Sequence, residues 1–319
     1  MPNDGIENRP KFFPLMSDSS AERQARRAVP TSTRLRILRQ ICGDFRRAVR
    51  PAPQHPQPAS WSDEKVTAAW LGHATVLVNF FGVRILADPV FFARCGIHIG
   101  PLTVGPKRYI AAALTPAELP PIDLVLLTHA HMDHLDLRTL RALPRDTVVV
   151  AAAQTADIFR RVKFREVIEL DWNETREIQT ARGGVTISAF QLRHWGARMQ
   201  YDDFRRYNAY LLERGGRRLC HMGDTARTDA RVLSSRGPID LLCAPIGAYH
   251  PWIHAHCSPE EAAAMADEAG ARFVMPIHHQ TFKLSWEPMD EPIARLRAAL
   301  AHDPQRLALT EIGQTFTLP

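Results

Sequence analysis

The chain has 319 residues, of which 45% are hydrophobic and 23% are charged, a composition that suits a globular protein with a sizeable core. It contains no run of about 18 apolar residues, and its start lacks a basic stretch followed by an apolar one, so we expect neither a transmembrane helix nor a secretory signal. Residues 1–60 hold 11 Lys and Arg against 5 Asp and Glu, which accounts for the whole net charge of +6 and leaves the rest of the chain balanced.

The N-terminal 60 residues differ in composition from the rest of the chain. Residues 1–31 are polar and interrupted by prolines, which predicts a loose arm. Residues 32–50 place apolar side chains at helical spacing between arginines, which predicts an amphipathic helix. This helix either packs on the main domain with a solvated arginine face or contacts an anionic membrane surface. Residues 51–60 are proline-rich and predict an extended linker. We therefore expect a basic arm over 1–60 and one domain over 61–319.

Short apolar runs separated by turn residues predict strands throughout that domain. They cover residues 66–72, 74–82, 83–89, 122–129, 146–153, 166–172, 184–192, 207–213, 217–224, 239–247 and 271–279. Helices are predicted at 155–162 and 258–270, where Ser258 and Glu261 have the spacing of a capping box. Strands followed by mixed strands and helices predict an α/β domain with two sheets and covering helices.

The stretch LLTHAHMDHLD (126–136) ends an apolar run in a cluster of imidazoles and carboxylates. His129 and His131 point the same way in an extended segment and can converge on one ion. Asp133 and His134 come where the chain should turn into a helix near Leu137, which directs them to a second point nearby. Imidazole nitrogen and carboxylate oxygen are good ligands for Zn²⁺. Four side chains cannot complete two sites, so further ligands must come from elsewhere.

Three later strands also end in metal-binding residue types: His194, Asp224 and His278. A single histidine after a strand is usually structural, and Asp224 alone would suit a turn or a helix cap. The dense cluster at 129–134 favours the metal interpretation, because buried carboxylates and imidazoles are costly without a cation. Strand ends can meet along one edge of a sandwich, so we expect all seven side chains to converge.

The motif HxHxDH, followed by His, Asp and His in order, resembles the metallo-β-lactamase fold superfamily. Within it, the chain is similar to the N-acyl phosphatidylethanolamine phospholipase D branch and, more distantly, to L-ascorbate-6-phosphate lactonases. The similar stretches span about residues 60–290 and include WLGHATVLV (70–78), ADP (87–89), GPKRY (105–109), ELDWNE (169–174), HWGAR (194–198), GPIDLLCAPIGAY (237–249) and HCSPEEA (256–262). That branch usually reads HWGTF where this chain reads HHQTF (278–282), which keeps His278 and changes its two neighbours.

The resemblance implies an αββα sandwich, two mixed sheets flanked by helices, with a dinuclear zinc site along one edge. It implies one metal on His129, His131 and His194, a second on Asp133, His134 and His278, and Asp224 as the bridge. His256 matches a histidine near the catalytic centre of the phospholipase branch. We expect His73, in GHAT, to support the site from outside the ligand set or to be structural.

The implied activity is metal-assisted hydrolysis. A hydroxide held between two zinc ions about 3.5–4 Å apart is a strong nucleophile at neutral pH. Asp133 would orient it, and His256 would donate a proton to the leaving group or bind the scissile group. We expect two Zn²⁺, with Mn²⁺ or Fe²⁺ as alternatives, and a phosphodiesterase of phospholipase D type acting on a small-molecule or lipid-like substrate. A lactonase or another ester or thioester hydrolase on the same site remains an alternative.

Two other classes of function are less favoured. A nuclease needs a cationic surface near its site, whereas the domain carries no net charge, so we expect no nucleic-acid partner. A non-catalytic metal-binding protein is disfavoured because the ligand set is complete. The five cysteines are odd in number and form no CxxC pair, which favours reduced thiols and a cytoplasmic location, peripheral to the membrane if the helix at 32–50 binds lipid.

Overall fold

The computed structural model describes residues 43–44, 47–100, 102–199 and 201–319. By its internal contacts the chain divides into Met1–Gln40 and Ile41–Pro319, and the described residues belong to the second unit. The arm at 1–31 and most of the helix expected at 32–50 lie outside the described residues, so both interpretations of that helix remain predictions.

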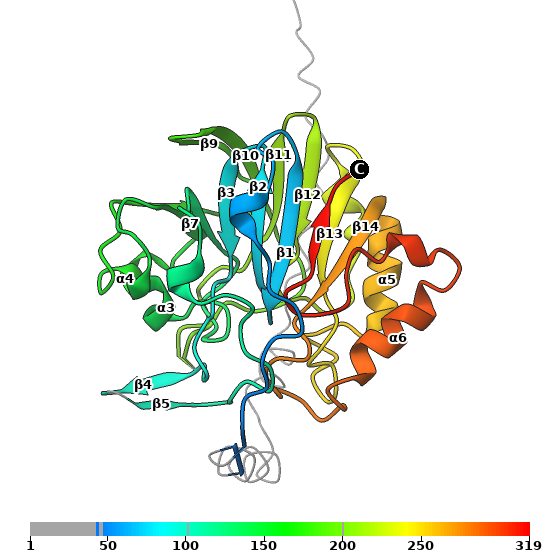
Figure 1. The fold of residues 1–319 in the computed structure, drawn as a ribbon, viewed down its shortest axis with the longest axis horizontal. Coiled ribbons are helices and arrows are strands. Elements are labelled where there is room, and N and C mark those ends of the chain that lie inside the picture. The colour runs from blue at the N-terminus through cyan, green and yellow to red at the C-terminus, as the bar shows by residue number, and fades with distance from the viewer. Residues whose placement is uncertain (1–42, 45–46, 101, 200) are drawn as a thin grey trace, which may run out of the picture. The chain divides into compact units, whose positions relative to one another are not determined.

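A seven-stranded mixed sheet forms one layer, in the order β15-β1-β2-β3-β6-β7-β8 (Figure 1). Its strands are β1 (Val66–Gly72), β2 (Thr75–Phe80), β3 (Val83–Ala87), β6 (Leu124–Leu127), β7 (Val148–Ala152), β8 (Glu166–Leu170) and β15 (Thr315–Thr317). The strands β3, β6, β7 and β8 run parallel. Every residue of β6 is buried, as its continuous apolar sequence predicts for a strand covered on both faces.

A six-stranded mixed sheet forms the second layer, in the order β14-β13-β12-β11-β10-β9. Its strands are β9 (Thr175–Thr180), β10 (Gly183–Phe190), β11 (Ala209–Arg214), β12 (Arg217–His221), β13 (Ile239–Pro245) and β14 (Ala271–Ile277). Successive side chains of a strand face opposite sides of the sheet. Tyr210 and Leu212 accordingly join the core shared with the first sheet, whereas Leu211 joins the core on the other side.

Helices cover the outer faces of the two sheets. α5 (Pro259–Glu268) and α6 (Glu291–Ala299) pack on the second sheet, where Met265 and Leu296 share a core with Leu242 and Val274 (Figure 1). α3 (Leu137–Ala142) and α4 (Ala156–Phe159) follow β6 and β7 of the first sheet. Short 3₁₀ helices connect other elements: η1 (Pro58–Ser60), η2 (Pro116–Glu118), η3 (Ala230–Ser234) and η4 (Pro304–Arg306). The predicted αββα sandwich of two mixed sheets is confirmed.

The predicted elements correspond closely to those observed. Each predicted strand is present, α3 begins at Leu137, and the capping box of Ser258 and Glu261 opens α5. The patterns missed β9, β15, α6 and a separate hairpin formed by β4 (Ile97–Ile99) and β5 (Leu102–Val104). Within the described ranges, none of the helices combines the length and hydropathy that a membrane-spanning helix requires.

The proline-rich segment at 51–60 packs on the domain. Pro56 and Pro58 are buried, and the Gln54 backbone N–H donates to Ile312 O at 3.2 Å. Just before it, the Arg47 guanidinium donates to Lys107 O at 2.7 Å. This segment is therefore part of the surface layer of the domain rather than a free spacer.

Candidate metal centre

The segment that carries the histidine motif is anchored at both ends. At its start, the Thr128 N–H and hydroxyl donate to the Asp88 carboxylate at 2.8 and 2.6 Å. At its end, Asp136 caps α3 by accepting from the Thr139 N–H at 3.0 Å. Between them the chain makes one tight turn, in which the Leu135 N–H donates to His131 O at 2.8 Å. The end of a buried strand thus passes directly into a helix, and the motif side chains project from the turn.

The loops that follow strands of both sheets bring the other side chains to this turn. Gly223 precedes Asp224 with a φ of +61°, and a Cβ at this position would lie 2.8 Å from Thr128 Cβ, so only glycine fits there. His278, after β14, donates its N–H to His73 O after β1 at 2.9 Å. The edges of the two sheets are therefore joined at the site.

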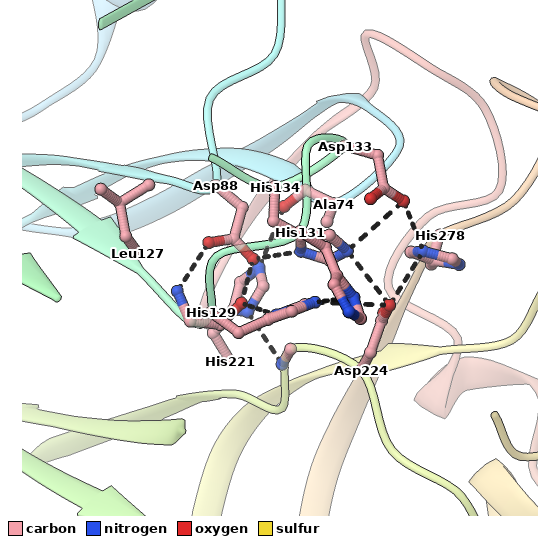
Figure 2. A network of polar contacts seen from close by, with 12 residues as sticks. Ala74, Asp88, Leu127, His129, His131, Asp133, His134, His221, Asp224 and His278 are labelled. Carbon is pink, nitrogen blue, oxygen red and sulfur yellow. Dashed lines mark hydrogen bonds and ion pairs between the residues drawn. The ribbon is translucent and has the colours of Figure 1, made fainter. Parts of the chain in front are cut away.

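One oxygen of Asp224 lies at the centre of the cluster (Figure 2). Its Oδ2 atom is 3.2 Å from the Nε2 atoms of His134 and His278. Three more imidazole nitrogens lie within 3.8–4.0 Å of it, those of His129, His194 and His256. The side chain is 1% exposed. Five imidazoles thus surround a single buried carboxylate oxygen, as a shared ligand requires.

Two groups of side chains have ligand atoms close enough to hold one cation each. The first contains His129, His131, His194 and Asp224, and the second contains His73, Asp133, His134 and His278. A further overlapping group joins Asp224 and His278 with His256. The structure therefore brings all seven side chains expected as ligands close together, and His256 lies against Asp224 and His278. The first group matches the implied set, whereas the second contains His73, expected outside the ligand set, and does not contain Asp224, expected as the bridge.

The protonation of the cluster is set by burial and by its two carboxylates. Burial lowers the pKa values of His129 and His194 well below their usual range, which keeps both imidazoles neutral at pH 7. Burial also opposes charge on His278, but Asp224 and Asp133 raise its pKa to about 9. The pKa of His134 is raised in the same way, against burial, by Asp224 and the other nearby carboxylates. Protons on His134 and His278 therefore balance the negative charge of the carboxylates that a bound cation would otherwise balance.

Residues outside the ligand set orient the imidazoles. The Asp88 carboxylate, fully buried at the end of β3, lies 2.7 Å from His134 Nδ1. His194 Nδ1 lies 3.0 Å from Ala255 O. His221 lies 3.0 Å through Nε2 from Ala74 O, and its Nδ1 accepts from the Gly223 N–H at 3.2 Å (Figure 2). The partners of His134 and His194 fix the tautomer and the direction of these imidazoles, whereas His221 holds the turn before Asp224.

Sequence reasoning missed Asp88 and His221 as members of this site. Asp88 follows a strand end in ADP, the same kind of position that identified Asp224, and that was the available signal. His221 is the last residue of β12 but lies within the strand predicted at 217–224, so it carried none. His73, expected in a supporting or structural role, lies with Nε2 2.9 Å from Asp133 Oδ2 and so holds that carboxylate in place.

His279 occupies the position where the phospholipase branch usually has tryptophan. Its ring stacks on Trp70 with centroids 4.5 Å apart and an interplanar angle of 21°. Among the described residues neither of its ring nitrogens has a hydrogen-bond partner, and burial lowers its pKa to about 3. The side chain therefore acts as a neutral aromatic ring that supports the strand end before the cluster.

This burial of His279 predicts a specific loss of stability in acid. Its pKa falls from 6.5 to about 3 on folding, so between these values the unfolded chain binds the extra proton. Stability is complete above about pH 6.5 and decreases as the pH falls toward 3. We expect His279→Phe to keep the free energy of unfolding within about 1 kcal/mol at neutral pH. The variant should lose about 1–2 kcal/mol less than the wild type on transfer to about pH 5. Urea unfolding at both pH values measures this, and identical acid sensitivity would contradict it.

Comparisons with known proteins give the context of this geometry. The family model described as beta-lactamase superfamily domain matches residues 83–279, a range that includes all seven expected ligands. N-acyl-phosphatidylethanolamine-hydrolyzing phospholipase D 1 of Caenorhabditis elegans is 30% identical over 238 residues, which cover 70% of this chain and 66% of that protein. A metal-dependent hydrolase of Geobacillus thermodenitrificans is 28% identical over 222 residues, covering 66% and 84%.

A solved structure agrees with the fold. Igni18, a metallo hydrolase from the archaeon Ignicoccus hospitalis, matches with a TM-score of 0.61 at 20% identity, over 80% of this chain and 99% of that one. This likeness concerns the arrangement of the sheets and helices alone.

Proposed function

This chain belongs to the β-lactamase superfamily of metal-dependent hydrolases, and we propose that it cleaves a phosphodiester bond in a phospholipid-like substrate with two zinc ions. The observation that carries the site assignment is the Asp224 oxygen within 3.2–4.0 Å of five imidazole nitrogens. The substrate class is supported by the 30% identity to a phospholipase D that hydrolyses N-acyl-phosphatidylethanolamine.

The buried donor atoms fit a divalent cation. Among the described residues, Asp224 Oδ1 is buried without a hydrogen-bond partner, and His134 Nε2 and His278 Nε2 lie 3.2 Å from Asp224 Oδ2 without the alignment of a hydrogen bond. A buried polar atom without a partner typically costs about 1–3 kcal/mol, so such a group of them favours an added ion. Nitrogen and carboxylate donors suit Zn²⁺, and Mn²⁺ or Fe²⁺ are the alternatives. We assign His129, His131 and His194 to one ion, Asp133, His134 and His278 to the other, and Asp224 to both.

The reaction divides between the ions and the surrounding side chains. Bound divalent ions would act as Lewis acids and lower the pKa of water from 15.7 to about 7. Asp133, held through Oδ2 by His73, is placed to accept a hydrogen bond from the attacking water and to orient it. His73 is thus a positioning residue.

His256 is proposed to serve the leaving group. Its side chain is 10% exposed, and its ring stacks beside that of His278 with centroids 5.3 Å apart. Burial lowers its pKa to about 4, so at neutral pH the imidazole is uncharged and has one N–H to donate. From there the uncharged imidazole can hydrogen-bond the scissile phosphoryl group. To protonate the departing oxygen it would first have to take up the proton that the attacking water releases, and then pass that proton on.

A substrate panel tests the proposed reaction. The purified chain is assayed with bis-p-nitrophenyl phosphate, with N-acyl phosphatidylethanolamine in mixed micelles, with a simple lactone, with an aryl thioester and with single-stranded DNA. We expect bis-p-nitrophenyl phosphate and N-acyl phosphatidylethanolamine to be turned over more than about tenfold faster than the other three substrates, and Asp133→Asn to lose that turnover. Preference for the lactone or the thioester would replace the proposal with the alternative hydrolase, and preference for DNA would make the chain a nuclease.

Asp88 lies outside the proposed ligand set, but its position predicts that substituting it weakens metal binding. The Asp88 carboxylate contacts both the Thr128 N–H and His134 Nδ1. In Asp88→Asn, one amide group has to contact both of these atoms in place of the carboxylate. Removing such an outer partner typically weakens metal binding about 10–100-fold, and we expect that range here. Competition with a chromogenic chelator measures it. Asp146→Asn, an exposed substitution, is the matched control, and equal affinities in the two variants would contradict the role of Asp88.

A further inference from the structure

Exposed apolar side chains are concentrated in two short segments. Of the nine large hydrophobic side chains that are exposed among the described residues, four lie on the β4–β5 hairpin and three follow Arg198. Scattered exposed hydrophobics are normal on a soluble surface, but a contiguous group marks a contact with another phase or molecule. The hydrolytic site does not explain why the side chains of these two segments are both apolar and exposed.

The β4–β5 hairpin presents one fully aliphatic face. Ile97 pairs with Val104 and Ile99 pairs with Leu102, so all four side chains lie on the same side of the two strands. Ile97 and Val104 are each 47% exposed, Ile99 is 62% exposed and Leu102 is 67% exposed. The hairpin is a two-stranded sheet of its own and lies apart from the two large sheets in Figure 1. An isolated hairpin is at best marginally stable in water, so this face suits a surface that covers it.

The opposite, polar face fastens the hairpin to the hydrolytic site. His98 lies through Nδ1 2.9 Å from Thr103 Oγ1 and through Nε2 3.1 Å from Asp136 Oδ1. Asp136 is buried and follows the HxHxDH motif by two residues. The apolar face is therefore held in a fixed relation to the residues that we assign to metal binding.

The second segment is fastened to the same place. Met199, Tyr201 and Phe204 are 36%, 79% and 54% exposed. Arg198, directly before them, donates to Ala130 O at 3.1 Å and to Leu135 O at 2.8 Å. Both apolar groups are thus anchored on the segment at 130–136, and they border the site rather than being distributed over the domain.

Positive charge lies at the base of the hairpin, where Arg94 and Lys107 pair in an isolated bridge. Asp44 accepts a hydrogen bond from the Lys107 N–H at 3.2 Å, three residues beyond β5. The 42 residues before Gly43 hold 8 Lys and Arg against 4 Asp and Glu, and they join the domain at this point of the chain. A partner that covers aliphatic side chains and also attracts cations has an apolar interior and an anionic surface, which describes an anionic lipid bilayer.

We propose that the β4–β5 hairpin docks the protein on anionic lipid surfaces by inserting Ile97, Ile99, Leu102 and Val104, with the side chains of Met199, Tyr201 and Phe204 as a second contact. The inference deepens the proposed function, on which its purpose rests, because docking would present the hydrolytic site to lipid headgroups. A second copy of this chain is the rival occupant of the same face, and vesicle binding together with light scattering separates the two.

Vesicle sedimentation of the full-length chain tests the proposal. The probes are vesicles of phosphatidylcholine alone and of phosphatidylcholine mixed with phosphatidylglycerol. The wild type should partition more than about tenfold better onto the anionic vesicles, with the preference decreasing at high salt. The double substitution Ile99→Ser and Leu102→Ser should weaken this partitioning at least about tenfold. Val232→Ser, which changes an exposed aliphatic side chain on η3, is the matched control and should bind as the wild type does.

Two further measurements keep the outcomes distinct. Turnover of bis-p-nitrophenyl phosphate needs no bilayer, so it should be equal in the wild type, the hairpin variant and the Val232→Ser control. A wild type that binds vesicles but does not turn over this substrate would refute the proposed reaction and leave the docking proposal standing. Equal vesicle binding by the wild type and the hairpin variant would overturn the docking proposal. A wild-type dimer in light scattering that the hairpin variant dissociates, without vesicle binding, would assign the face to a second copy instead.

Discussion

Replacing Asp224 by asparagine should remove metal and activity together. The carboxylate oxygen at the centre of the cluster lies within 4.0 Å of imidazoles from both proposed metal groups, so this side chain can serve both. Losing a partner outside the ligand set costs about 10–100-fold in affinity or activity, so we expect the loss of this shared ligand to exceed a hundredfold. Elemental analysis of the purified variant and phosphodiesterase assays measure the two effects.

A matched substitution separates this effect from a general change in charge. Asp229→Asn alters an exposed aspartate only five residues away, one that pairs with Arg231 on the surface. An amide can still cap η3 at this position, so metal content and turnover should remain those of the wild type. Retention of stoichiometric metal and full turnover in Asp224→Asn would refute the assignment of the centre.

Removing the metal should abolish hydrolysis and lower thermal stability in the same titration. An ion that binds only the folded state contributes about 2.7 kcal/mol when present at 100 times its dissociation constant. For a domain of this size that corresponds to a decrease of roughly 5 °C or more in melting temperature. Activity and melting curves are followed as chelator is added, and then as Zn²⁺, Mn²⁺ or Fe²⁺ is returned separately. The ion that restores both identifies the metal.

The Asp224→Asn variant is the internal control for chelation. If the ions bind where the clustered side chains converge, the chelator should leave the melting temperature of this variant unchanged. A fall in melting temperature equal to that of the wild type would place the stabilising ion elsewhere in the molecule. Full activity of the wild type after dialysis against chelator would contradict metal-assisted hydrolysis altogether.

The sequence predicted the elements whose pattern is dictated by burial. Strands such as β6 are apolar throughout because both faces are covered, and this pattern is visible without any structure. The strand β9 was missed because only Ile178 of its six residues is buried, so it has no apolar period. The hairpin strands were missed for a related reason: their aliphatic side chains point away from the domain, and no core dictates their pattern.

The proposed ligands were predictable because each follows an abrupt strand end. Asp88 has the same kind of position, but the long-range contacts that make it and His221 part of the site were not predictable. The contact of Asp88 with Thr128 joins residues 40 positions apart, and that of His221 with Ala74 joins residues 147 apart. No local sequence pattern indicates contacts between residues so far apart in the chain. The reason for this difference is physical. A ligand must follow the end of a strand or helix to project into the site, while a supporting residue can lie anywhere that packing brings it close to the ligands.

The backbone hydrogen bond between His278 and His73 affects the order in which the proposed metal centre can assemble during synthesis. The centre draws on side chains from the first strand to the last strand of the second sheet, so no fragment of a nascent chain can assemble it. The N-terminal part emerges from the ribosome first and can form strands early. The second proposed metal group includes His278, so it can be completed only after β14 has docked, whereas the first group ends at Asp224 and does not need that strand. A chain that stalls before β14 would therefore hold at most the first of the two proposed ions.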